Sequence, residues 1–326
     1  MQIVILAGGV GGSRFTRGVL AAYPDAEITV VVNTADDVTL HGLRICPDLD
    51  TVMYALGGGI DPDRGWGRAE ETWSVRSELE AYGAEPTWFG LGDRDLATHL
   101  VRTQALNAGY PLSDVTAALS RRWLSDLPHV TLLPMSDDRV ETHVVIADPA
   151  GLEERRAVHF QEYWVRLHAE PEARDVVQVG MAEARPAPGV LEAIGSADLV
   201  LVAPSNPVVS IGPILAVPGL RAAVQSSAAP VVGFSPIIGT APVLGMAHRL
   251  LPAIGVEVSA EAVGRHYGSR SAGGVLDGWL VHQADEVAVP RLTADGLRCL
   301  ATDLIMHSPA ATARFVRAGV GLVAAP

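Results

Sequence analysis

The stretch that decides the fold is residues 28–50, ITVVVNTADDVTLHGLRICPDLD. It begins with an apolar, β-branched run that is typical of a buried parallel strand and stops at Asn33. Four carboxylates in two pairs follow the end of this run: Asp36, Asp37, Asp48 and Asp50. Because ligands of an open α/β sheet bind beyond the carboxyl ends of its strands, these acids are expected to face a ligand. Crowded carboxylates repel one another unless a cation lies among them, so the stretch indicates a hard divalent metal.

These acids also have simpler interpretations. Taken singly, Asp36 or Asp37 is more often a helix N-cap or a solvated turn residue than a ligand. An acid after the second strand can also hydrogen-bond a ribose, as in dinucleotide enzymes, so the metal interpretation is not unique. Two acid pairs at one strand end favour a metal or a hydroxyl-rich ligand.

The chain opens, from Gln2 to Leu20, with a short apolar strand, a glycine-rich turn and an amphipathic helix. The turn glycines let backbone N–H groups approach a ligand at the positive end of the helix, which favours phosphate: Gly8, Gly9, Gly11 and Gly12. The sequence GGVGGSR lacks the Lys-Ser/Thr pair of a P-loop and departs from GxGxxG. The alternative is that glycine only permits a tight turn. At the first turn of an α/β chain, phosphate binding is favoured over it.

Later segments predict the rest of the sheet. Apolar runs predict strands at residues 129–135, 142–147, 198–203, 230–234, 279–282 and 297–304, and residues 309–322 predict a closing amphipathic helix. Residues 51–127 predict a mainly helical insertion, with helices at 51–59 and 70–83. We therefore expect one α/β domain over residues 1–326, built on a doubly wound, mainly parallel sheet with a helical insertion.

Two of these strands end in serine-bearing loops stiffened by proline. The strand at 198–203 runs into PSNPVVSIGPIL, residues 204–215, which carries Ser205, Asn206 and Ser210. The strand at 230–234 ends at Ser235 and is followed by Pro236. Two such loops indicate a ligand-binding face of the sheet.

Charged side chains concentrate near a helix start in WFGLGDRDLATHLVRT, residues 88–103. Asp95 is best explained by a capped helix with an intrahelical ion pair, whereas Arg94 could meet an anion or a carbonyl of a planar ligand. Asp137 and Asp138, which follow the strand at 129–135, are interpreted as a turn only.

The net charge and cysteine content of the chain indicate which partners and which cellular compartment to expect. The formal charge of −13 argues against nucleic acid and anionic membranes as partners. The sequence has no apolar run near the roughly 20 residues needed to span a bilayer, and its N-terminus lacks the apolar region of a signal peptide. Cys46 and Cys299 are too few for a disulfide framework, so we expect a cytoplasmic protein.

Eight ordered motifs closely resemble one known family, the 2-phospho-L-lactate transferases of deazaflavin coenzyme biosynthesis. They are LAGGVGGSRF, VVNTADD, HGLRICPDLDTVMY, WFGLGDRDLATHLVRT, LLPMSDD, FQEYWV, APSNPVVSIGPILAVPG and SPIIG, and the matches reach about Val263. The stretch HYGSRSAGGVLDGWLV, residues 266–281, is similar to the actinobacterial branch of phosphoenolpyruvate-type transferases. The resemblance implies a Rossmann-like, homodimeric, magnesium-dependent enzyme. Such an enzyme joins a guanosine-diphosphate-activated three-carbon acid to the riboflavin-like chromophore Fo and releases GMP, giving coenzyme F-420 without its glutamate tail or the dehydro form.

The resemblance also implies roles for individual residues. The nucleotide is expected over the glycine turn and the neighbouring strand ends, at Gly8, Gly9, Gly11, Gly12, Asn33, Ser205, Asn206, Ser210 and Ser235. Mg²⁺ is expected on Asp37 and Asp50. Contacts with Fo are expected from Asp50, Arg94 and His99. Asp50 or Asp48 is expected to orient or deprotonate the attacking hydroxyl.

Two other functions remain open from sequence. A related group of nucleotide-sugar-binding regulatory proteins shares the glycine turn and general fold, and would bind a ligand without making product. A nicotinamide-dependent oxidoreductase would use the first turn and an acid after the second strand. The sequence does not distinguish a lactyl from an enolpyruvyl donor, although the actinobacterial likeness favours enolpyruvate.

Overall fold

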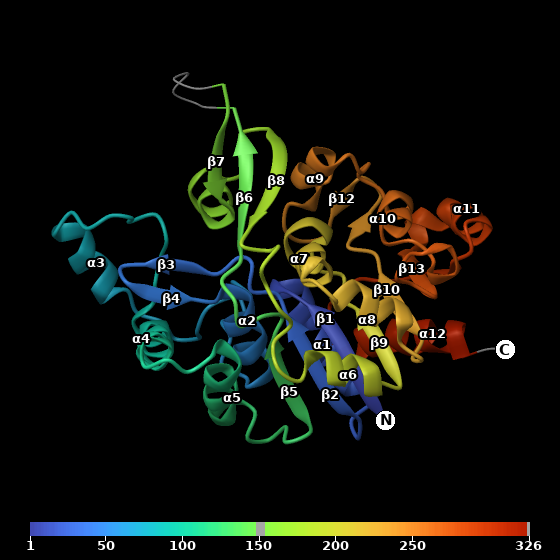
Figure 1. Ribbon diagram of the computed structural model, residues 1–326, viewed down its shortest axis with the longest axis horizontal. Coiled ribbons are helices and arrows are strands. Elements are labelled where there is room, and N and C mark those ends of the chain that lie inside the picture. Colours follow the sequence, from blue (N-terminus) through green and yellow to red (C-terminus); the bar gives the residue numbers. More distant parts are fainter. Residues whose placement is uncertain (148–153, 325–326) are drawn as a thin grey trace.

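A parallel sheet forms the centre of the protein in the computed structural model, which describes residues 1–147 and 154–324. Seven strands of these residues form it, in the order β14-β13-β10-β9-β1-β2-β5 (Figure 1). Their bounds are Gln2–Ala7 (β1), Glu27–Val32 (β2), Val130–Pro134 (β5), Leu199–Val202 (β9), Val231–Phe234 (β10), Gly278–His282 (β13) and Arg298–Thr302 (β14). The chain adds β2 and β5 on one side of β1 and then returns to β9 on the other. The predicted doubly wound, mainly parallel sheet is confirmed, and its switch point lies between β1 and β9.

Alternation along the buried strands divides the core between two faces. Ile3 and Ile5 pack into one apolar cluster, and Val4 and Leu6 pack into the other. The first cluster is covered by α1 (Gly9–Ala22), α2 (Pro47–Leu56), α5 (Leu112–Trp123) and α12 (Pro309–Ala324). The second is covered by α6 (Val190–Ser196), α7 (Gly212–Ala216), α8 (Leu220–Ser226), α9 (Ala247–Leu250), α10 (Ala260–Tyr267) and α11 (Val289–Ala294).

The segment between β2 and β5 differs from its prediction in detail. The helix expected from Thr51 to Gly59 begins at Pro47 and ends at Leu56, because proline is well suited to the first helical position. Asp48 and Asp50 therefore lie in the first turn of α2, where the positive helix end favours acids. The helix expected at 70–83 is shorter, as α3 (Ser74–Ala81), because residues 70–73 belong to the irregular segment that precedes it. The helix expected after Trp88 is α4 (Asp93–Asn107).

Two small antiparallel sheets near the central sheet were not predicted as sheets, although the strand predicted at 142–147 is present in one of them as β6 (Glu141–Ile146). One is the hairpin of β3 (Val38–Leu40) and β4 (Leu43–Ile45), which lies between the two acid pairs. The other, in the order β7-β6-β8, is formed by β6 (Glu141–Ile146), β7 (Arg156–His159) and β8 (Ala173–Val179), with a π-helical turn at Glu162–Arg166. In Figure 1 this sheet stands at the top, while α3, β3 and β4 lie on the side away from α10, α11 and α12. A further two-stranded ladder pairs β11 (Ile237–Ile238) with β12 (Ala241–Pro242).

A membrane span requires a helix of sufficient length and hydrophobicity. Among the described residues, no single helix is long and apolar enough to cross a bilayer, although 207–216 and 220–226 together pass by length and composition, with an 83° bend between them.

Candidate active site

At the switch point of the sheet, a serine and a glycine are hydrogen-bonded to each other. The Gly8 N–H, just after β1, donates to the Ser205 hydroxyl at 3.1 Å, and that hydroxyl donates to the Gly8 carbonyl at 2.8 Å. Ser205 follows β9 and is buried, so these two bonds join neighbouring strand ends that are 197 residues apart in the chain. The glycine turn is thereby held at the crevice where open α/β sheets bind ligands.

The first two glycines of the turn leave room for other polar groups. A Cβ added at Gly8 would lie 2.5 Å from Asp48 Oδ2 and 2.7 Å from the Cβ of Ser210. Gly9 has a φ of +57°, which a side chain would strain, and its backbone N–H donates to Asp48. Because Gly8 and Gly9 have no side chains, Asp48 and Ser210 can lie close to the backbone of the turn.

The other two glycines serve packing. A Cβ at Gly11 would lie 3.0 Å from the Pro204 carbonyl oxygen, and one at Gly12 would lie 2.8 Å from the Cβ of Ala7. These positions allow α1 to approach β1 and the loop after β9 closely. They support the turn in addition to the nucleotide role expected for them.

Asp48 and Asp36 form a buried acidic pair. The Asn33 side-chain amide, just after β2, donates to Asp48 Oδ2 at 2.9 Å, and Asn33 Oδ1 accepts from the Ala35 N–H. Burial raises the pKa of Asp48 to about 7, although the hydrogen bond from Asn33 opposes the shift. The pKa of Asp36 is also raised well above its usual value, by burial first and then by the charges of Asp48 and Asp37. Because both carboxyl groups are buried and close together, ionising both at once is unfavourable without a nearby cation.

Asp37 has an arginine partner on the β3–β4 hairpin. Arg44 Nη2 donates to Asp37 Oδ2 at 3.1 Å, yet burial still raises the pKa of Asp37 to about 6. The other oxygen, Asp37 Oδ1, and Asp36 Oδ1 are buried and have no hydrogen-bond partner among the described residues. Two unpartnered carboxylate oxygens in an acidic cluster are suited to a hard divalent cation such as Mg²⁺.

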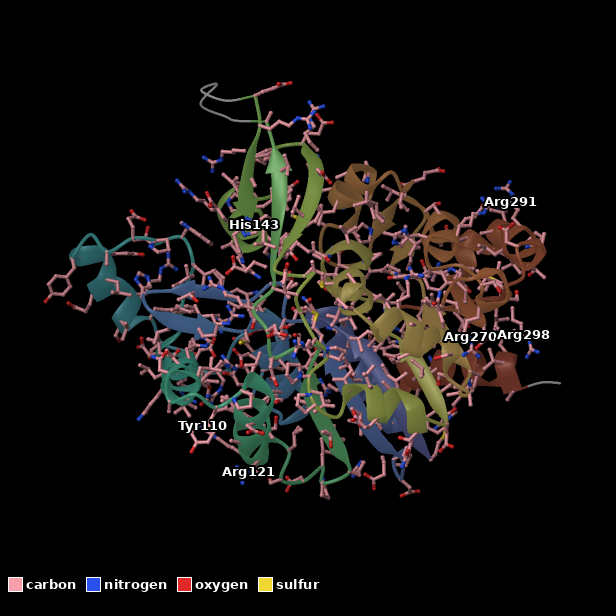
Figure 2. All side chains as sticks on the ribbon, in the orientation of Figure 1. Tyr110, Arg121, His143, Arg270, Arg291 and Arg298 are labelled. Carbon is pink, nitrogen blue, oxygen red and sulfur yellow. The ribbon has the colours of Figure 1, made fainter. Side chains whose placement is uncertain are left out.

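The three-stranded sheet β7-β6-β8 contacts the backbone of residues 35–37, which carry Asp36 and Asp37. The Thr142 N–H donates to the Ala35 carbonyl at 2.7 Å, and His159 Nε2 lies 3.2 Å from the Asp37 carbonyl oxygen. Figure 2 marks His143 on β6, whose ring packs edge-on against His159 with 5.5 Å between centroids. The FQEYWV stretch contributes as well, because the Gln161 amide donates to the Asp36 carbonyl.

Asp50 points to α4 and forms a buried ion pair that sequence reasoning missed. Arg102 Nη1 donates to Asp50 Oδ2 at 3.0 Å, and Nη2 donates to Asp50 Oδ1. His99 lies beside the pair, with Nδ1 3.7 Å from Asp50 Oδ2 and Nε2 3.4 Å from Asp95 Oδ2. Asp95 also accepts from the Tyr54 hydroxyl at 2.6 Å. The expected helix-start role of Asp95 therefore includes its intrahelical contact with His99.

Asp50, Asp95 and His99 have the composition of a metal site, with ligand atoms all within 4.8 Å of one another. The Arg102 guanidinium already supplies a cation to Asp50, and the Tyr54 hydroxyl already donates to Asp95. Asp50 and Asp95 are thus already paired with donors, whereas His99 Nε2 is buried without a hydrogen-bond partner among the described residues.

Several predicted site residues lie outside these contacts. Arg94 is half exposed and pairs with Glu70 at 3.2 Å. The Asn206 side chain caps its own turn by accepting from the Val208 N–H at 2.9 Å, and the Ser235 hydroxyl binds the backbone of Ile237. The Asn206 and Ser235 side chains therefore stabilise the loops that follow β9 and β10, whereas Arg94 lies on the surface of α4.

The acids after β5 have structural partners. Asp137 accepts from both the backbone N–H and the hydroxyl of Ser113, at the start of α5, and Asp138 accepts from the Arg185 N–H. Arg102 belongs to the charged cluster predicted in residues 88–103, but no sequence signal paired it with Asp50, which is 52 residues away. For Arg44, recognition of the β3–β4 hairpin would have been the available signal, since it folds Arg44 back toward Asp37.

Comparison with known proteins identifies the family. The family model of 2-phospho-L-lactate transferase CofD matches residues 3–315. A phosphoenolpyruvate transferase of Nocardia farcinica is 58% identical over 321 residues, which is 98% of this chain and 94% of that protein. One of Kitasatospora aureofaciens is 61% identical over 323 residues, covering 99% and 98%. A solved structure of a UPF0052-family protein from Bacillus halodurans is similar in fold, with a TM-score of 0.64 at 18% identity over 97% of this chain and 98% of that one. The chain belongs to the 2-phospho-L-lactate transferase family and is a phosphotransferase enzyme.

Proposed function

We propose that this transferase of coenzyme F-420 biosynthesis moves an enolpyruvyl-phospho group from a guanosine-diphosphate-activated donor to the terminal ribityl hydroxyl of the deazaflavin Fo. The products would be dehydro-coenzyme F-420-0 and GMP, or F-420-0 and GMP from a lactyl donor. The enolpyruvyl donor is favoured because the relatives of about 60% identity are named phosphoenolpyruvate transferases. The observation that carries the proposal is the buried contact of Asp48 with the glycine turn at the switch point.

The reaction is an in-line displacement at phosphorus. The ribityl oxygen forms a bond to the phosphorus that carries the three-carbon acid, and the bond from that phosphorus to the bridging oxygen breaks. The bridging oxygen and its electron pair leave with GMP, and the hydroxyl proton passes to a protein carboxylate. Such transfers depend on positioning and on neutralisation of charge more than on covalent catalysis.

Each residue around the switch point is given a role in diphosphate binding, proton transfer or orientation of the acceptor. The Ser210 hydroxyl and the N–H groups in the first turn of α1, at Val10 and Gly11, would bind the diphosphate, because the Gly8 and Gly9 N–H groups already donate to Ser205 and Asp48. Asp48 would accept the hydroxyl proton, since a pKa of about 7 matches a general base at neutral pH. Asp50 would orient the acceptor hydroxyl, with His99 behind it and Arg94 at the outer edge.

Magnesium is proposed as the cofactor and would neutralise the charge of the diphosphate. Asp37 is proposed as a ligand through its unpartnered Oδ1, and the neighbouring Asp36 offers a second such oxygen. The charge of Asp50, which the family resemblance pairs with Asp37, is already neutralised by the Arg102 guanidinium. We therefore favour Asp36 over Asp50 as the second ligand. A homodimeric enzyme is proposed from the resemblance alone, and a cytoplasmic location from the low cysteine content.

The experiment is a product assay. Purified protein, Mg²⁺, Fo and the enolpyruvyl guanosine diphosphate donor are incubated, and mass spectrometry follows a phosphodiester-linked deazaflavin and GMP. Metal-dependent product supports the proposal, and substitution of the lactyl donor measures donor preference. Nucleotide binding without product from either donor would instead favour a nucleotide-binding regulatory protein.

A further inference from the structure

Arg102 is a buried arginine committed to one carboxylate. It is 2% exposed, and both terminal nitrogens donate to Asp50, one to each oxygen. Its Nη1 also lies 3.4 Å from the Arg44 carbonyl oxygen and 3.3 Å from His99 Nδ1. The guanidinium therefore joins α2, α4 and β4 at a single point.

Stability is a weak reason for such a pair. Desolvation of two buried charges offsets most of their attraction, and well-packed apolar residues often serve the fold as well. A two-pronged guanidinium does have one property that a single ammonium lacks: it fixes the plane and direction of the carboxylate that it binds. At Asp50 this orientation is set by α4, outside the central sheet.

The surroundings hold the arginine itself in place. Because Arg102 Nη1 is a donor, His99 Nδ1 accepts, and the proton of the neutral ring is then on Nε2, which lies 3.4 Å from Asp95 Oδ2 without forming a hydrogen bond. Asp95 is in turn bound by the Tyr54 hydroxyl, which comes from α2. Two separate contacts, Arg102 with Asp50 and Tyr54 with Asp95, therefore join α4 to the helix that carries Asp48 and Asp50.

We propose that Arg102 is a positioning residue for the transfer reaction, an inference that rests on the proposed function. Its fork occupies one lone pair on each oxygen of Asp50 and leaves the others to receive the acceptor hydroxyl. In this arrangement Asp50 binds the Arg102 guanidinium and the acceptor hydroxyl. The unpartnered oxygens of Asp36 and Asp37 bind the metal.

The decisive variant is Arg102→Lys, which keeps the charge but loses the fork. We expect its melting temperature and its GDP affinity to stay close to those of the wild type. Its kcat in the Fo assay at saturating donor is expected to fall about 30-fold or more, because a misdirected carboxylate misplaces the hydroxyl. The matched control is Arg265→Lys, an exposed arginine on α10 that pairs with Glu261 and Asp295, and its rate should not change.

A second variant covers the case in which lysine is not tolerated. Arg102→Ala removes the whole fork, and guanidinium ion in the millimolar range is expected to restore part of the lost rate, whereas methylammonium is not. Arg102→Lys at the wild-type rate, or rescue by both cations alike, would show that the pair is only a structural counter-charge. Wild-type protein that makes no product from either donor overturns the proposed function and this inference together.

Discussion

The Ser205 hydroxyl makes two hydrogen bonds to one residue: it accepts from the Gly8 N–H and donates to the Gly8 carbonyl. The two residues follow β1 and β9, the strands on either side of the switch point. The geometry of the glycine turn is therefore set by the neighbouring strand as well as by its own sequence.

The first prediction concerns this pair. Ser205→Ala leaves the Gly8 N–H and carbonyl buried without their partner, and each such hydrogen bond contributes about 1 kcal/mol. We expect GDP affinity, measured by isothermal titration calorimetry, to fall roughly 10-fold. Ser226→Ala, at an exposed serine that donates within α8, is the control and should bind GDP normally. Unchanged affinity in Ser205→Ala would separate this bond from nucleotide binding.

The second prediction concerns the space at Gly8. A Cβ there would lie 2.5 Å from Asp48 Oδ2, so Gly8→Ala must displace the carboxylate. We expect product formation to fall about 100-fold, since displacements near 1 Å are enough for such losses. Gly195→Ala, in α6 with open space around the added Cβ, should retain full activity and equal or greater thermal stability. An active Gly8→Ala enzyme would contradict the proposed role of Asp48.

The third prediction is a dependence of stability on pH. The folded pKa of Asp48 is about 7, above its unfolded value, so the native state binds more protons between these values. In the presence of EDTA, the free energy of unfolding should therefore fall as pH rises from 4 to 7. Asp48→Asn should reduce this fall by on the order of 3 kcal/mol, at about 1.4 kcal/mol per pKa unit. Urea unfolding at pH 5 and pH 8 measures both proteins, and parallel curves would argue against the shift.

The fourth prediction concerns the metal. If Asp37 binds Mg²⁺ through Oδ1, EDTA should abolish product formation and Asp37→Asn should raise the half-saturating Mg²⁺ concentration about 10-fold or more. Excess Mg²⁺ should restore part of the rate in this variant. Asp63→Asn, at an exposed acid, should titrate with Mg²⁺ as the wild type does. A metal-independent wild-type rate would remove magnesium from the proposal.

The sheet was predictable because its signals are local. Apolar β-branched runs such as 28–32 and 199–202 are long enough to be recognised alone, and each was predicted close to its observed bounds. The helix at 51–59 was placed too late because its first turn carries the acids Asp48 and Asp50, which were interpreted only as ligand-facing residues beyond the strand end. The strand at 142–147 was predicted and is β6, but its partners β7 and β8 were not, because β7 has only four residues and β8 buries few of its side chains.

The sequence by itself determined the α/β class, the family, and the clustering of glycines and acids beyond β1 and β2, because these features are local and contiguous. Only the tertiary structure decided which cation meets which acid. Arg44 lies on Asp37, Arg102 binds Asp50 from 52 residues away, and Ser205 binds Gly8 from 197 residues away. Such pairs depend on how strands and helices pack after the chain has crossed the sheet, and the spacing of residues along the chain carries no record of that packing.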